Sequence, residues 1–136
     1  MYQKILIPTL LDNPELLANA VNNARLLLAP QGTITLLNVV EEIPVYAETY
    51  VVTEALTKIR DDAKQQLDEM AAALGSDLHT KVVKGHAGRT IMTEMEAQNA
   101  DLTIISSHRP GLADYFLGST ANHVVRYAQC PVLVLR

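Results

Sequence analysis

The feature that most constrains the fold is the alternation of short, β-rich apolar runs with stretches of helical periodicity along the whole chain. An alternation of this kind predicts an α/β fold, in which a mostly parallel sheet is built by right-handed crossovers and carries helices on both faces. The run at 102–105 is nearly all apolar, as expected for a strand buried on both faces. The predicted strands are residues 4–9, 33–40, 79–84, 102–105 and 131–135.

Helix start and stop signals separate these strands. Asp12 or Asn13 can cap a first helix with Pro14 at its first position, and Pro30-Gln31-Gly32 is predicted to end it. Residues 41–51 are predicted to form a loop that carries Tyr46 and Tyr50. Further helices are predicted over 56–74 (ended by Gly75), around 91–95, and over 118–128. No repeat or linker interrupts the pattern, so we expect one domain over residues 1–136.

Composition excludes several classes of function. The net charge is −4, with 11 basic and 15 acidic residues, one Phe and no Trp, which is unlike a nucleic-acid binder. No apolar run approaches the roughly 20 residues of a membrane-spanning helix, and residues 1–8 resemble a first strand rather than a secretory signal. The single cysteine, Cys130, excludes an internal disulfide framework. We therefore expect a cytoplasmic protein with no membrane or nucleic-acid partner.

The segment from Ser106 to Thr120 is the strongest candidate for a ligand site. It is small, polar and glycine-containing, follows the buried fourth strand, and leads into a helix at Gly118. Unpaired N–H groups at a helix N-terminus attract phosphate, and the hydroxyls of Ser119 and Thr120 can add hydrogen bonds. In the alternative interpretation, Ser119 or Thr120 only caps the helix and Pro110-Gly111 forms a type II turn. Composition alone does not decide between the two.

Topology places a site in the same region. In open α/β sheets, ligands bind beyond the carboxyl ends of the strands, where the winding direction reverses. If the first strand is central, residues 8–12 and the chain from Ser106 onward form that site.

Other motifs are weaker. Gly85-His86-Ala87-Gly88 follows the third strand but lacks the P-loop and dinucleotide patterns, so it predicts a turn with at most one backbone contact to a ligand. The histidines show no metal-ligand spacing with one another or with Cys130, and no nucleophile elbow is present. We predict no catalytic residue and no metal ligand.

Several motifs, taken in order, resemble the universal stress protein family over essentially all 136 residues. They are Lys4-Ile5-Leu6-Ile7-Pro8, Leu36-Leu37-Asn38-Val39-Val40, Ala100 to His108, Leu117-Gly118-Ser119-Thr120 and Ala128 to Leu135. The resemblance implies a Rossmann-like, doubly wound sheet of order 3-2-1-4-5, in an adenine-nucleotide alpha-hydrolase-like domain. It also implies a homodimer formed through the last strand (Val132, Leu133, Val134 and Leu135). Many members bind ATP, so ATP or AMP is the implied ligand, with magnesium accompanying only ATP.

The family's nucleotide-binding pattern is Gly, two residues, Gly, nine residues, then Gly-Ser or Gly-Thr. This chain retains only its end, Gly118-Ser119, while Ser106 and His108 stand in place of the two earlier glycines. Leu10 aligns with an acidic residue that usually follows the first strand. Pro110-Gly111 resembles the turn of a shorter-loop subgroup.

Together these observations predict a stress-response protein that binds an adenine nucleotide as a regulatory ligand. One alternative is a nucleotide-free dimeric interaction module, with Tyr46 and Tyr50 on its contact surface. A slow nucleotide hydrolase is a further alternative, for which Asp12, His108 and Asp114 could supply the base and metal ligands. The predicted nucleotide-binding residues are Pro8, Thr9, Leu10, Val39, Gly85, Ser106, Ser107, His108, Arg109, Gly111, Gly118, Ser119 and Thr120.

Overall fold

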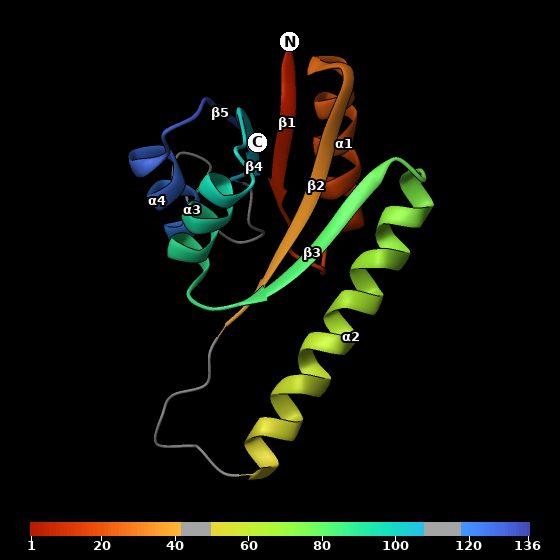
Figure 1. The fold of residues 1–136 in the computed structure, drawn as a ribbon, viewed down its shortest axis with the longest axis vertical. Helices are drawn as coiled ribbons and strands as arrows, with labels where there is room; N and C mark the ends of the chain where they lie inside the picture. The colour runs from red at the N-terminus through yellow and green to blue at the C-terminus, as the bar shows by residue number, and fades with distance from the viewer. Residues whose placement is uncertain (42–49, 108–117) are drawn as a thin grey trace.

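A computed structural model describes residues 1–41, 50–107 and 118–136 of the chain (Figure 1). Its strands form one parallel sheet of order β3-β2-β1-β4-β5, with β1 at the centre. The predicted fold class and the strand order implied by the resemblance are both confirmed. The elements are β1 (Tyr2–Pro8), α1 (Pro14–Leu27), β2 (Leu28–Val40), α2 (Tyr50–Leu74), β3 (Leu78–Lys84), α3 (Ala87–Ala97), β4 (Leu102–Ser106), α4 (Ser119–Tyr127) and β5 (Val132–Leu135).

Two hydrophobic clusters lie on opposite faces of the sheet. Ile5 and Ile7 of β1 pack with α1 and α2, whereas Leu6 packs with α3 and α4 on the other face (Figure 1). This division follows from the strand geometry, because successive side chains of a strand point to opposite faces. Residues 102–105 are all buried, as the apolar fourth run predicts.

The start of α1 agrees with the sequence prediction, but its end does not. Asn13 is the N-cap, and its side-chain oxygen accepts a hydrogen bond from the N–H of Leu16 at 3.2 Å. The helix ends at Leu27 and β2 begins at Leu28, before Pro30-Gln31-Gly32 rather than after it. That tripeptide forms an irregularity in the β1–β2 pairing, where Tyr2 pairs with Leu28 but Lys4 pairs with Thr33.

Long-range pairing explains this difference. Gln31 has a φ of 66°, and a Cβ on Gly32 would lie 3.0 Å from the carbonyl oxygen of Gln3 on the neighbouring strand. Residues with turn chemistry are therefore accommodated inside a strand as a bulge-like kink.

The start of α2 also differs from the prediction. Tyr50, predicted to lie in a loop, is the first residue of the helix, which begins six residues before Leu56. Residues 51–53 are all β-branched, and β-branched side chains lower helix propensity, so the sequence obscures this start. Tyr46 lies outside the described residues. The N-terminal part of α2 extends past the end of the sheet (Figure 1).

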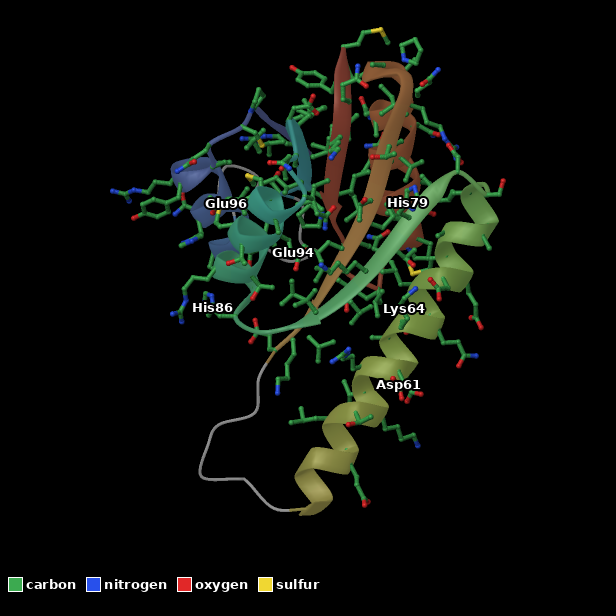
Figure 2. The ribbon with its side chains drawn as sticks, in the orientation of Figure 1. Asp61, Lys64, His79, His86, Glu94 and Glu96 are labelled. Atoms are coloured by element: carbon green, nitrogen blue, oxygen red, sulfur yellow. The ribbon has the colours of Figure 1, made fainter. Side chains whose placement is uncertain are left out.

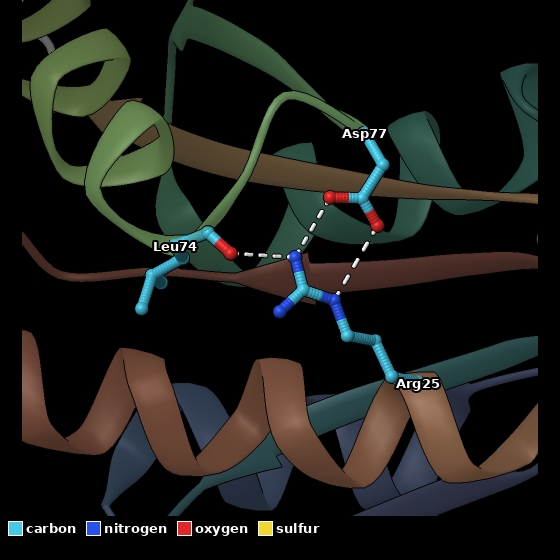
Figure 3. A network of polar contacts seen from close by, with 3 residues as sticks. All are labelled: Arg25, Leu74 and Asp77. Atoms are coloured by element: carbon cyan, nitrogen blue, oxygen red, sulfur yellow. Dashed lines mark hydrogen bonds and ion pairs between the residues drawn. The ribbon is translucent and has the colours of Figure 1, made fainter.

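A polar network fixes the turn after α2 against α1 (Figure 3). Arg25 Nη2 donates to the carbonyl oxygen of Leu74 and to Asp77 Oδ1, each at 2.7 Å. The hydrogen bond from Arg25 lowers the pKa of the Asp77 carboxyl. Gly75 lies between them with a φ of 143°, so the predicted stop of this helix at Gly75 is confirmed.

Asp101 ties the central strand to the start of β4. Its two carboxylate oxygens accept hydrogen bonds from the N–H groups of Gln3 and Lys4, both at 2.8 Å, and its own N–H donates to the carbonyl oxygen of Lys4 at 2.9 Å. Desolvation acts to raise the pKa of this carboxyl. The hydrogen bonds from Gln3 and Lys4 outweigh that effect, so the pKa lies below its ordinary value of 3.8.

Within the described ranges, no helix is both long enough and apolar enough to cross a membrane.

Candidate functional site

A cavity of about 220 Å³ opens at the carboxyl ends of β1, β2 and β4. Because β1 and β4 are neighbours in the sheet while the connections after them run to opposite faces, this is the point where the winding reverses. The cavity therefore occupies the place where topology alone predicts a ligand site.

The cavity wall is mostly apolar, with a few polar groups at its rim and floor. Ile7, Leu17, Leu37, Ile91 and Ile105 belong to the apolar part. Among the described lining residues, Glu41 alone has a charged side chain. The polar lining residues are Thr9, Asn13, Asn38, Glu41, Ser106, Ser107 and Thr120. Apolar walls with a small number of placed polar groups are typical of small-molecule sites.

Most of the predicted nucleotide-binding residues that the structure describes lie in this wall. They are Pro8, Thr9, Leu10, Val39, Ser106, Ser107, Gly118 and Thr120. Three others, His108, Arg109 and Gly111, lie outside the described residues.

Gly85 and Ser119 are predicted site residues that do not line the cavity. Gly85 is buried, and its N–H donates to the carbonyl oxygen of Val40 at 2.9 Å, so that N–H is already used within the protein. Ser119 is exposed at the first position of α4. The N-cap of α4 is Gly118, and no side chain caps this helix, so the interpretation of Ser119 or Thr120 as a cap is wrong.

Three helices begin at the cavity. Asn13 before α1, Ala87 at the start of α3 and Gly118 before α4 all line it. Asn13 caps α1 with its side chain, whereas α3 and α4 have no side-chain cap hydrogen bond. The first N–H groups of a helix lack partners within the helix and carry partial positive charge. The rim can therefore accept an anion without a lysine or arginine.

Buried polar groups hold the strand ends that form the cavity floor. The N–H of Thr9 donates to the carbonyl oxygen of Leu37 at 2.7 Å, and Asn38 Nδ2 donates to the carbonyl oxygen of Thr9 at 2.8 Å. The N–H of Ser107 donates to the carbonyl oxygen of Leu135 at 2.8 Å. These hydrogen bonds fix the end of β1 against β2 and the end of β4 against β5.

Sequence reasoning missed three polar lining residues, Asn13, Asn38 and Glu41, and predicted Asn13 only as a helix cap. Signals for the other two exist in the sequence. Asn38 is an amide within the apolar run of the second strand, and Glu41 directly follows that strand. In sheets of this class, an acidic residue after the second strand is a known position for contacting a ribose hydroxyl.

The most buried carboxylate of the described residues lies away from the cavity. Glu94 of α3 is 7% exposed, and it pairs with Lys81 of β3 at 2.8 Å, between that helix and the sheet edge (Figure 2). Burial acts to raise the pKa of Glu94, but hydrogen bonds from Lys81 and Gln98 lower it overall. An ionised, fully paired carboxylate in this position ties helix to sheet rather than exchanging protons with a ligand.

The residues proposed for hydrolysis are not assembled in the described part of the site. Asp12 does not line the cavity, and His108 and Asp114 lie outside the described residues. Over residues 1–41, 50–107 and 118–136, no group of three or more His, Cys, Asp or Glu side chains is placed to hold a metal ion.

Comparison with known proteins identifies the family. The model of the universal stress protein family matches residues 1–136. The chain belongs to this family. Universal stress protein G of Salmonella typhimurium is 31% identical, and the similarity covers all of both chains. Universal stress protein MJ0531 of Methanocaldococcus jannaschii is 30% identical over all of this chain and 83% of its own length.

Solved structures of similar proteins share the architecture. The hypothetical protein MJ0577 superposes with a TM-score of 0.81 at 26% identity, over 99% of this chain and 96% of its own. Two more distant structures show the same fold and carry nucleotides. A universal stress protein in complex with cAMP has a TM-score of 0.63 at 19% identity. The universal stress protein of Archaeoglobus fulgidus in complex with dAMP has a TM-score of 0.59 at 15% identity.

Proposed function

We propose that this universal stress protein binds an adenine nucleotide, ATP or AMP, as a regulatory ligand in the cavity at the ends of β1, β2 and β4. The observation that carries the proposal is the combination of an apolar cavity with the uncapped start of α4 at Gly118. The nucleotide complexes of the two distant relatives support the same ligand class.

The volume of the cavity favours an arrangement in which the base and sugar of the ligand lie inside and its phosphates lie outside. At about 220 Å³ it is smaller than the roughly 300–1,000 Å³ of typical drug-sized sites. The base and sugar would fill it, against Thr9 and Val39. The phosphates would then lie outside, over Ser106, Ser107 and the N–H groups that begin α4. The proposed role is regulatory, because phosphoryl transfer depends on placed cations and a positioned water, and the sequence offers only Asp12, His108 and Asp114 to supply them.

Calorimetric titration tests the proposal. ATP, ADP and AMP are added to the folded protein, with and without magnesium. Gly118 has a φ of −63°, which suits any residue, so Gly118→Val adds bulk to the cavity wall without backbone strain. We expect this variant to weaken binding by at least about tenfold, the loss that corresponds to roughly 1.4 kcal/mol.

Asn122→Val is the matched control, because Asn122 is exposed one turn further along α4, does not line the cavity, and already donates its N–H to the carbonyl oxygen of Gly118 at 2.9 Å. It should bind like the wild type. The absence of heat with every nucleotide at millimolar concentration would refute the proposal and leave the nucleotide-free dimeric module as the better account. Denaturation followed by chromatography of the supernatant shows independently whether a nucleotide co-purifies.

We also propose that the protein is a homodimer formed through β5. The two edge strands of the sheet differ in a way that supports this. The edge strand β3 carries Lys81 and Lys84, and lysine discourages edge pairing. By contrast, β5 reads Val-Leu-Val-Leu, with all four side chains only half-buried in the protomer. For the wild type, light scattering should give twice the mass of the monomer. Val134→Lys places a charge on β5 and should give a monomer. A wild-type monomer at micromolar concentration would contradict the proposal.

Residues 1–136 are proposed to form a single domain, and the cellular location is proposed to be the cytoplasm. The location rests on the single cysteine, Cys130, which gives no internal disulfide. Fractionation of the native host tests it.

A further inference from the structure

Asn38 is a buried side chain in the cavity wall whose hydrogen-bonding capacity is only partly used. It is 7% exposed and lies at the carboxyl end of β2, on the strand next to β1. Its amide nitrogen donates to the carbonyl oxygen of Thr9 at 2.8 Å. A carbonyl oxygen can only accept, so this bond fixes which end of the amide is nitrogen and which is oxygen.

The Oδ1 atom of Asn38 accepts no hydrogen bond from any described residue. Every buried side-chain nitrogen or oxygen in the described part of the chain has a partner, so this oxygen is not sealed in the core. Because Asn38 as a whole is nearly buried and lines the cavity, the open side of its oxygen faces the cavity. The site therefore contains a fixed hydrogen-bond acceptor at its floor.

Two neighbouring lining residues do not offer the same group. The hydroxyl of Thr9 donates to the carbonyl oxygen of Ile7 at 3.0 Å, and the side-chain oxygen of Asn13 accepts from the N–H of Leu16. The Thr9 hydroxyl keeps lone pairs that can accept, but a hydroxyl can rotate to donate or to accept, so it is not a fixed acceptor like Oδ1 of Asn38. The side-chain oxygen of Asn13 already serves to hold the start of α1.

We propose that Asn38 is a specificity-determining residue, whose Oδ1 selects a base with an exocyclic amino group over one with a carbonyl oxygen at that position. This inference rests on the proposed function of the cavity. The amino group of adenine donates a hydrogen bond to Oδ1. Hypoxanthine and guanine carry a 6-oxo group instead, so two acceptor oxygens, that group and Oδ1 of Asn38, would face each other and the buried amide oxygen would stay unpaired. Sites built to pair with a donor reject analogues that lack it.

AMP and IMP form a sensitive test, because they differ at the base position that would face Asn38 and carry the same sugar and phosphate. We expect calorimetric titration of the wild type to give AMP at least about tenfold tighter binding than IMP. In Asn38→Ala the ratio of the two affinities should fall to about one, whatever the change in AMP affinity itself.

Val39→Ala is the matched control, because Val39 also lines the cavity but offers no polar side-chain atom. It should weaken AMP and IMP alike and leave their ratio unchanged. Equal binding of AMP and IMP to the wild type would overturn the inference. An unchanged ratio of the AMP and IMP affinities in a folded Asn38→Ala would overturn it as well. Both results would leave the proposed function standing. If Asn38→Ala fails to fold, Asn38→Ser removes the same amide oxygen and is compared with the wild type in the same way. Binding of neither ligand would overturn the proposed function and this inference with it.

Discussion

Asp101 offers a quantitative test of how the central strand is held. Both of its carboxylate oxygens accept backbone hydrogen bonds at 2.8 Å, from Gln3 and Lys4 at the start of β1. In Asp101→Asn one oxygen becomes an NH₂ group that faces an N–H donor, so at least one bond is lost and two donors are brought together. Hydrogen bonds to charged acceptors contribute about 1.5–3 kcal/mol each.

The expected loss is smaller than the roughly 3–6 kcal/mol to which two such bonds would sum. Because this contact lies near the protein surface, water can replace part of what the carboxylate provides. We expect the free energy of unfolding to fall by about 2 kcal/mol at neutral pH. For a chain of 136 residues this corresponds to a drop in Tm of roughly 6–8 °C.

The loss should depend on pH in a defined direction. Since the pKa of Asp101 lies below its ordinary value of 3.8 in the folded protein, the carboxylate stabilises the fold above that value. This contribution disappears as the pH falls through the lowered pKa, when the folded protein also takes up the proton. The difference between wild type and Asp101→Asn should therefore be full at neutral pH and shrink steadily below pH 3.8.

Urea unfolding followed by circular dichroism, repeated from neutral to acidic pH, measures both effects. Asp61→Asn is the matched control, because Asp61 is exposed on the outer face of α2 (Figure 2). It should change the free energy of unfolding by no more than about 0.5 kcal/mol. The reasoning is refuted if Asp101→Asn costs no more than this control, or if its cost stays constant through the acidic range.

Two further predictions concern packing. Leu67 is fully buried between α2 and the sheet, so Leu67→Ala should lower the free energy of unfolding by about 3 kcal/mol in urea titration, whereas Leu26→Ala, at a site 79% exposed, should be nearly neutral. A Cβ at Gly75 would lie 2.6 Å from both Arg25 Nη2 and Asp77 Oδ1, at a φ of 143° that side chains rarely adopt. Gly75→Ala should therefore cost about 1–3 kcal/mol and lower the Tm, while the neighbouring exposed Ser76→Ala should not; equal melting of the two would contradict this account.

Local sequence signals predicted the elements whose ends are set by neighbouring residues. Asn13-Pro14 marks the start of α1 because a cap needs only a side-chain oxygen three residues before the N–H it accepts. The ends of α2 and β2 also agree with the pattern, since glycine and charged residues follow them directly. The start of β2 was missed because pairing with β1 overrides the local turn preference of residues 30–32. The start of α2 was missed because the helix continues through residues of weak helix propensity.

The candidate site divides in the same way. Its position follows from the sequence, because the strand order and the reversal of winding bring residues 8–12 close to the chain from residue 106 onward. Gly118 marks the helix start that lies in the same wall. Asn38 and Glu41 entered the site only through the tertiary structure. The use of a polar atom depends on its hydrogen-bond partner, and for Asn38 that partner is Thr9, 29 residues away in the chain. Sequence thus determined where a ligand can bind, and the folded structure decided which atoms are left to recognise it.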